Sequence, residues 1–270
     1  MIKVFWAEFR RSMNIWFIIG IMGVAFSICF DSWNDLVSGL QNHSGYVHYF
    51  FWNSAFGGMC RSYLLPIFAT LPFATSFCAE RKCKSVAYIA SREGRIQYGV
   101  VKYIVNFVSG GFVVALGTGL VLVLLSMVFP MASSEISDAQ TADIFHDWLA
   151  VHRPMGYCLL QICLGFFRGM IWSSIALLVS VYIEDMFVVT VSPYVGSFAF
   201  VHFCRLMRID NNFRLDMILK GRSVIHSSQQ TVVIALISVM AIVFIVGVVF
   251  VRKMERGLRN GTIHQSRQNI

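Results

Sequence analysis

A single charged side chain, Arg168, lies near the middle of the fourth of six long apolar runs in the sequence. A mid-membrane arginine costs about 2.5–3.5 kcal/mol on insertion scales, so such a residue is by default a functional hypothesis. Gln161 shares its predicted helical face, and Asn106 lies near the inner end of the third run. These polar groups either line a substrate pathway or bond to carbonyls where helices pack, and for Asn106 we expect an interhelical hydrogen bond. Gly165 and Gly169 form a G-x-x-x-G pattern, which permits close helix approach.

A second group of charges lies between the second and third apolar runs. The acidic Glu80 stands among basic residues, and an apolar stretch at 86–90 precedes a second basic group and Gly94. This pattern predicts a short amphipathic helix parallel to the membrane, with a mixed-charge face toward a cytoplasmic partner. The alternative is an ordinary positively charged cytoplasmic loop. The charged residues that could contact such a partner are Glu80, Arg81, Lys82, Lys84, Arg92 and Arg95.

Motifs that would indicate an enzyme are missing from the sequence. There is no G-x-x-x-x-G-K-[ST] phosphate-binding loop, no H-E-x-x-H zinc motif and no G-x-S-x-G nucleophile motif. We interpret Gly196 and Ser197 as small packing residues and His202 as an interfacial histidine. The seven cysteines form no C-x-x-C pair. We therefore expect no enzyme, no catalytic residues, no metal ligands and no cofactor bound by this chain.

The composition places these residues in a membrane. Hydrophobic residues make up 57% of the 270 residues and charged residues only 13%, with a mean hydropathy of +0.66. A soluble chain of this size could not bury so much apolar surface. Only helices satisfy the backbone of such runs in lipid, so we expect an all-α membrane protein with one six-helix domain over residues 1–270. The predicted spans are residues 15–30, 63–78, 104–129, 156–183, 186–203 and 231–251.

Basic residues give the orientation of these spans. Segments 1–14, 79–103 and 252–270 hold most of the Lys and Arg, which places them and both termini in the cytoplasm. The net charge of +8 is therefore an orientation signal, and we expect no nucleic-acid partner. Residues 1–17 predict an amphipathic helix on the cytoplasmic membrane surface.

One outer segment, residues 204–230, is more basic than an outer loop should be. Placing it in the cytoplasm would require the loss of one span. We instead expect a short interfacial helix at the outer surface, capped by Asp210 or Asn211 and running through Leu219 before the sixth span.

The whole arrangement resembles the permease subunits of type-2 ATP-binding-cassette (ABC) transporters, most of which are exporters. Members of that family have an amphipathic N-terminal helix, six spans with both ends inside, and short interfacial helices before the sixth span. A Glu-bearing cytoplasmic coupling helix follows their second span. In this chain residues 205–221 match the outer helices, and the coupling-loop pattern is matched by Glu80, Ser91, Arg92, Tyr98 and Lys102.

This resemblance implies that ATP is hydrolysed by a separate cytoplasmic ABC ATPase subunit, which would bind ATP and magnesium. That subunit would dock on residues 80–95, and Glu80 would transmit force by pairing with one of its basic residues. A second permease chain, identical or a paralogue, would complete the translocation pathway. The implied ATPase-coupling residues are Glu80, Arg81, Lys82, Lys84, Arg92 and Arg95, and the candidate pathway residues are Arg168, Gln161 and Asn106.

The function expected from this reasoning is export, or expulsion from the membrane, of an amphipathic substrate such as an antimicrobial peptide or a drug. The protein would be a multi-pass component of a bacterial plasma membrane, in contact with its lipid. Two alternatives from other classes stay open. One is an ion-coupled secondary transporter with Arg168 and Gln161 as its site, and the other is a membrane assembly protein that transports nothing.

Overall fold

The computed structural model describes residues 2–42, 46, 47, 50, 59–83, 85–131, 154–210, 214–220 and 227–260. These residues form helices and connecting turns, with no strand among them, which confirms the all-α prediction. The helices are α1 (Ile2–Ser12), α2 (Ile15–Asp31), α3 (Trp33–Asn42), α5 (Met59–Thr70), α6 (Ala74–Lys82), α7 (Ser85–Glu93), α8 (Arg95–Val128), α10 (Pro154–Ser180), α11 (Met186–Leu206), α12 (Leu215–Leu219) and α13 (Ser228–Arg259).

Four of these helices are long and apolar enough to cross a membrane: α8, α10, α11 and α13. A fifth candidate is the pair α1 and α2, whose axes are bent by 52° at a short break. The break follows from Asn14, whose side-chain oxygen caps α2 by accepting from the backbone N–H groups of Trp16 and Phe17 at 2.9 and 3.2 Å. Several long apolar helices thus mark a multi-pass membrane protein.

The predicted span at 63–78 is not one continuous helix. Helix α5 ends at Thr70 and α6 begins at Ala74, with a turn between them. Pro72 lies in this turn, and proline removes a backbone donor and disfavours a helical conformation in the residue before it. The break divides the expected span into two short helices, so neither is long enough to cross a bilayer alone.

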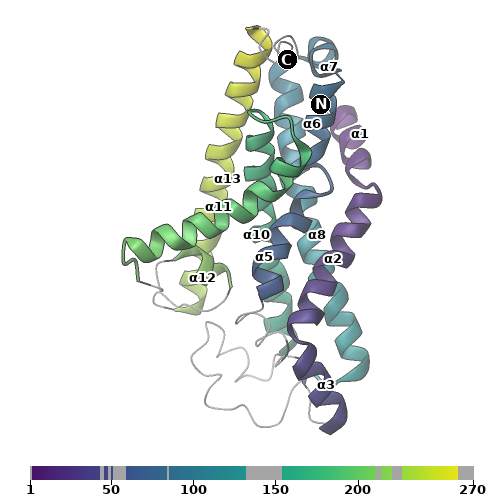
Figure 1. The fold of residues 1–270 in the computed structure, drawn as a ribbon, viewed down its shortest axis with the longest axis vertical. Coiled ribbons are helices and arrows are strands. Elements are labelled where there is room, and N and C mark those ends of the chain that lie inside the picture. Colours follow the sequence, from purple (N-terminus) through teal and green to yellow (C-terminus); the bar gives the residue numbers. More distant parts are fainter. Residues whose placement is uncertain are drawn as a thin grey trace.

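The bundle is elongated, and α10 lies at its centre (Figure 1), packed against α5, α6, α8, α11 and α13. Glycine residues allow the backbones of α8 and α10 to approach each other closely. A Cβ atom on Gly169 would lie 2.5 Å from the carbonyl oxygen of Gly110, so only glycine fits there. This confirms the close helix approach expected from the G-x-x-x-G pattern. Gly117 likewise admits Val24 of α2, because a Cβ atom there would lie 2.6 Å from the valine side chain.

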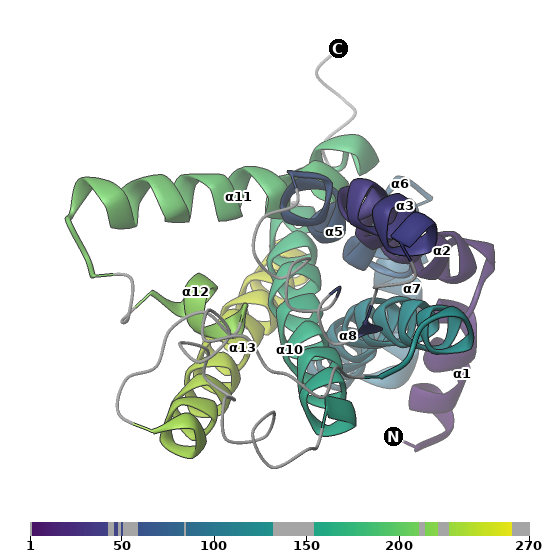
Figure 2. The same cartoon turned by 90° about the horizontal axis from the view of Figure 1, so that it is seen from below.

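Helix α11 leaves this bundle at an angle, and its far end extends away from the other helices (Figure 2). Large apolar side chains such as Phe198, Phe203 and Leu206 are exposed along this end. The chain turns at Arg208, which has a left-handed φ of 52°, and helix α12 follows only at Leu215. Within the described residues the outer helix begins at Leu215, with Arg214 rather than Asp210 at its N-cap position, and the other predicted cap, Asn211, lies outside the described residues.

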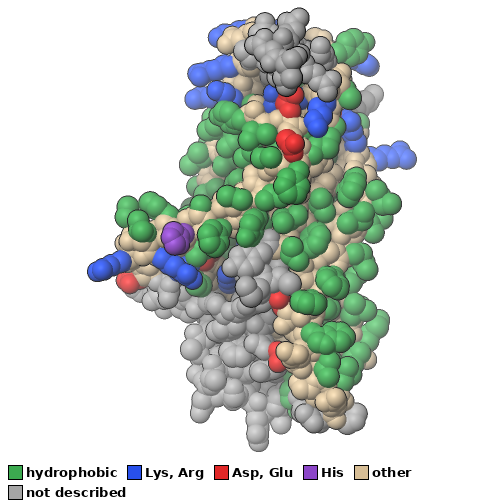
Figure 3. Space-filling view, in the orientation of Figure 1, with side chains coloured by type: hydrophobic (Ala, Val, Ile, Leu, Met, Phe, Trp, Pro, Cys, Tyr) green, Lys and Arg blue, Asp and Glu red, His purple; other side chains and the backbone are tan. Residues whose placement is uncertain are grey.

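Charge and apolar surface are separated along the molecule (Figure 3). Apolar side chains cover much of the length of the visible face. Lys and Arg side chains gather at the end that carries α1, α7 and the last turns of α13, with a smaller basic group at the tip of α11. This is the distribution expected of a protein whose middle lies in lipid and whose basic end lies in the cytoplasm.

Candidate functional site

A cluster of charged side chains, all but Arg11 largely buried, lies at the basic end of the bundle, where α1, α6 and α8 meet. Its centre is Glu80, the carboxylate of which is only 3% exposed. Oxygen Oε1 accepts from Lys102 Nζ at 2.6 Å and from Arg11 Nη1 at 2.5 Å, and Oε2 accepts from the Tyr98 hydroxyl. Glu8 completes the group, because its Oε2 lies 3.5 Å from Lys102 Nζ. We call these five residues the junction cluster.

Three helices bring the members of the cluster together. Tyr98 and Lys102 are four residues apart and so lie on one face of α8, near its start. Helix α8 follows directly on α7 because Gly94 adopts a φ of 90°, a conformation that glycine reaches without a steric penalty. Glu8 and Arg11 are likewise neighbours on α1, and Glu80 lies near the end of α6.

Lys102 is the most deeply buried charge of the cluster, with an exposed fraction of 0%. Its ammonium group lies 4.8 Å from the centre of the Phe73 ring and 5.7 Å from that of Tyr98. Burying an ion in this way is tolerated only when opposite charge and hydrogen bonds replace its water. Two carboxylates and two cations give the cluster no net charge, which satisfies that requirement.

The next residue, Arg81, ties α6 to the opposite side of the bundle. Its Nη1 donates to the backbone carbonyls of Ser180 and Val181 at 2.7 and 2.9 Å, and its Nη2 lies 3.0 Å from Glu184 Oε1. These carbonyls end helix α10, where unpaired acceptors and the helix dipole favour a cation. Two adjacent residues of α6 therefore bind in different directions: Glu80 to α1 and α8, and Arg81 to the turn between α10 and α11.

The surface helix α7 follows this double attachment after a short connection. It is amphipathic as predicted, with Val86 and Ala90 buried and Tyr88, Ser91 and Arg92 exposed. Helix α6, directly before α7, is thus joined to both sides of the bundle through ion pairs. The arrangement suits mechanical connection better than bond-making chemistry, because its charged groups are occupied by one another. Across the residues that the structure describes, no three His, Cys, Asp or Glu side chains are placed to hold a metal ion.

The predicted coupling residues divide into two sets. Lys82, Arg92 and Arg95 are exposed at the basic end, as a docking surface requires, while Lys84 lies outside the described residues. Glu80 and Arg81 are buried, so the expectation that Glu80 belongs to the exposed mixed-charge face is corrected. The physical reason is that this chain itself supplies the cations and the hydroxyl that neutralise the Glu80 carboxylate.

Glu8 and Arg11 were not predicted as partners of Glu80. One signal for a buried ionic cluster was present, because Lys102 stands four residues after Tyr98 just where the third apolar run begins. A lysine at such a position needs an acid within reach if it is buried. Nothing in the sequence pattern indicated that the acid would also bind Arg11.

The polar residues of the predicted spans are buried between helices. Asn106 Nδ2 donates to the Ser173 carbonyl at 2.7 Å, which joins α8 to α10 and confirms the expected interhelical hydrogen bond. Gln161 is fully buried and its Nε2 donates to the Tyr157 hydroxyl of the same helix at 3.3 Å. Arg168 is also buried, in α10. Their role in a translocation pathway stays a prediction.

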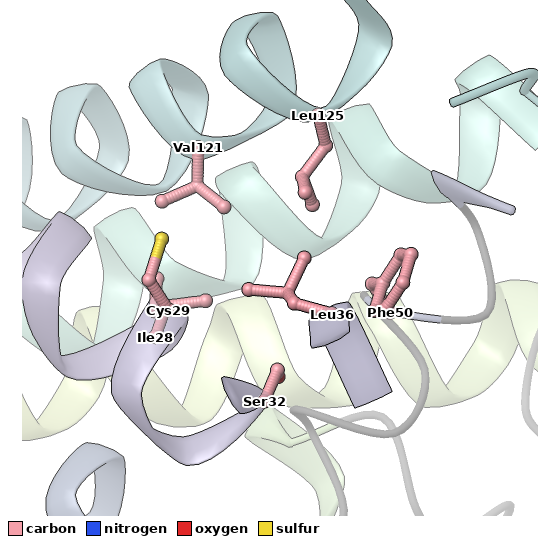
Figure 4. A pocket seen from close by; sticks show the side chains of 7 residues that line it. All are labelled: Ile28, Cys29, Ser32, Leu36, Phe50, Val121 and Leu125. Carbon is pink, nitrogen blue, oxygen red and sulfur yellow. The ribbon is translucent and has the colours of Figure 1, made fainter. Parts of the chain in front are cut away.

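A small apolar pocket lies between α2, α3 and α8 (Figure 4), at the opposite end from the junction cluster. Its lining offers one hydroxyl and one thiol and no charge, so it has little with which to bind a polar ligand. The lining residues are Ile28, Cys29, Ser32, Leu36, Phe50, Val121 and Leu125.

Comparison of the chain with models of protein families, with curated proteins and with solved structures found no match.

Proposed function

We propose that this chain is the permease subunit of an ABC exporter of the type-2 class, with both termini in the cytoplasm of a bacterial cell. The observation that carries the proposal is the double attachment of α6. Glu80 binds α1 and α8 while Arg81 binds the end of α10, and both lie directly before the exposed helix α7. A partner that pushes α7 would move both sides of the bundle at once.

Six spans require that two further elements each cross the membrane. The first is α2 at 17 residues, which is at the short end of the length that spans a bilayer. The second is the pair α5 and α6, broken at the turn before Ala74. A broken span next to the coupling helix suits the proposal, because the break lets α6 move without carrying all of α5 with it.

The partner would be a separate cytoplasmic ATPase that binds ATP and magnesium. Its docking surface is the exposed basic face formed by Lys82, Arg92 and Arg95, beside the exposed ring of Tyr88. Charge complementarity predicts an acidic surface on the ATPase. A second permease chain, identical or related, would complete a pathway for an amphipathic substrate such as an antimicrobial peptide or a drug.

The test is co-purification from native membranes in gentle detergent. We expect the tagged chain to recover an ATPase with a phosphate-binding loop, and Arg92→Glu to lower that recovery at least tenfold. Arg205→Glu is the matched control, because Arg205 is exposed on α11, away from α7. If the unmodified chain never recovers an ATPase, the proposal is wrong; if both variants reduce recovery equally, the docking surface is wrong.

An ion-coupled secondary transporter is a second candidate, favoured by one observation. Among the described residues, the side-chain amide oxygen Oε1 of Gln161 is buried without a hydrogen-bond partner, and Arg168 lies on the same helix. Buried polar groups of this kind mark ion or substrate pathways in other spans. Transport that survives depletion of ATP but collapses with an ionophore would favour this candidate. A membrane assembly protein without transport would show neither dependence.

A further inference from the structure

The N-terminal helix α1 has two faces with different surroundings. Phe5 and Phe9 pack toward the bundle against Phe73, Val101 and Val105, and Glu8 and Arg11 enter the junction cluster. The opposite face is formed by Trp6 and Arg10, four residues apart on α1, and is continued by Met13 just after the helix ends. We call these three residues the outward face of α1.

The outward face is an open groove with mixed chemistry. Trp6 is 62% exposed and Met13 is 53% exposed, and together with Ala7, Phe9 and Arg10 they line a shallow depression. The ring of Phe9 lines the depression on the side nearer the bundle, and it meets the Trp6 ring edge-on, with 6.1 Å between the ring centroids. The groove therefore offers an indole, a thioether and a guanidinium to one ligand.

The charges of the two neighbouring arginines are used differently. Arg11 donates to Glu80 in the junction cluster. Arg10 is exposed and, among the residues that the structure describes, forms no ion pair with a carboxylate. A guanidinium beside exposed apolar groups suits an anion that carries an apolar chain, because one ligand can then satisfy both.

The position of the groove indicates which anion this is. The exposed residues Ile15 and Trp16 follow the groove directly at the start of α2, and α1 and α2 together form one bent candidate span, so the groove lies in the first part of that span. Basic residues place this end in the cytoplasm, where the membrane leaflet is rich in anionic lipids. Tryptophan is also enriched at the depth of lipid headgroups.

We propose that the outward face of α1 binds an anionic phospholipid of the cytoplasmic leaflet. The lipid phosphate binds the Arg10 guanidinium, and the glycerol and first acyl carbons lie against Trp6 and Met13. Because the same helix carries Glu8 and Arg11, a bound lipid holds α1 against the junction cluster. Binding of the lipid does not depend on the transport function. Any effect of the lipid on the coupling between the ATPase and transport rests on the function proposed above.

The experiment uses the full chain in detergent, with native mass spectrometry counting retained lipid after exchange with phosphatidylglycerol or phosphatidylcholine. We expect preferential retention of phosphatidylglycerol, and about fivefold weaker retention in Arg10→Gln. That factor corresponds to about 1 kcal/mol for one basic residue at an anionic surface. Arg10→Lys, which keeps the charge, should retain most of the preference. Arg205→Gln is the control, because it removes an exposed arginine from α11.

Three results would overturn the proposal. One is equal retention of the two lipids by the unmodified chain, and a second is an unchanged preference in Arg10→Gln. The third is displacement of the lipid by inorganic phosphate, which would indicate a site for a free anion. No ATPase takes part in these measurements, so failure of the exporter proposal would leave their outcome unaffected. An unchanged unfolding midpoint in Arg10→Gln would support a role in lipid binding, because Arg10 contributes nothing to the junction cluster.

Discussion

Replacing Glu80 by glutamine removes the charge at the centre of the junction cluster and changes its shape very little. Lys102 then stays fully buried, with its Nζ no closer than 3.5 Å to the remaining carboxylate, that of Glu8. Breaking a buried pair by removing one partner costs about 3–5 kcal/mol. We expect a value near the lower end, about 3 kcal/mol, because Glu8 and the Phe73 and Tyr98 rings still face the ammonium group.

A loss of about 3 kcal/mol changes the ratio of folded to unfolded protein by about 150-fold. The assay is reversible unfolding in mixed detergent micelles, followed by far-ultraviolet circular dichroism. Glu184→Gln is the matched control. Its partner Arg81 keeps two hydrogen bonds to the carbonyls of Ser180 and Val181, so this control should cost only about 1 kcal/mol.

A double variant separates the ion pair from a general loss of packing. Combining Glu80→Gln with Lys102→Met removes both charges, so no uncompensated ammonium group is left in the interior. The double variant should lose about 2 kcal/mol less free energy of unfolding than the sum of the losses in Glu80→Gln and Lys102→Met. Two results would refute the buried ion pair. One is a loss of stability in Glu80→Gln no larger than that in Glu184→Gln. The other is a double variant whose loss equals the sum of the losses in Glu80→Gln and Lys102→Met.

Three further substitutions test other parts of the bundle. Gly169→Leu should abolish most of the folded protein, measured as monodisperse yield, because its Cβ would meet the Gly110 carbonyl oxygen at 2.5 Å. Asn106→Leu should cost about 1 kcal/mol or less in the same unfolding assay, since it loses one bond to the Ser173 carbonyl. A larger loss would mean that this bond is not the main role of Asn106. Arg81→Met should speed hydrogen exchange in the turn between α10 and α11 while leaving α2 unchanged.

Composition and apolar runs were enough to predict the class of the protein and most of its long helices. Helices α11 and α13 contain their predicted spans, while α8 and α10 end one and three residues before the predicted ends, because a long apolar run has one solution in lipid. The break before Ala74 was not predicted, although Pro66 and Pro72 both stand in the run 63–78. Hydropathy averages over a window and does not register the missing backbone donor of a proline.

The junction cluster could be predicted only in part. The charged residues around Glu80 and the amphipathic character of α7 are local patterns, and the structure contains both. That Glu80 binds Arg11 depends on the 52° bend between α1 and α2, which brings α1 alongside α8. Such an angle results from tertiary packing, so no spacing along the sequence reports it.

The order of residues in the junction cluster has a consequence for synthesis of the chain. Arg11 and Glu80 are 69 residues apart, and Lys102 follows Glu80 by another 22. At about 5–20 residues per second, the ribosome needs on the order of a few seconds between Glu80 and Lys102. During that interval Glu80 has been synthesised but Lys102, its most deeply buried partner, has not. Helix α1 therefore cannot settle into its final position until the start of α8 has been made, although α1 is translated well before α8.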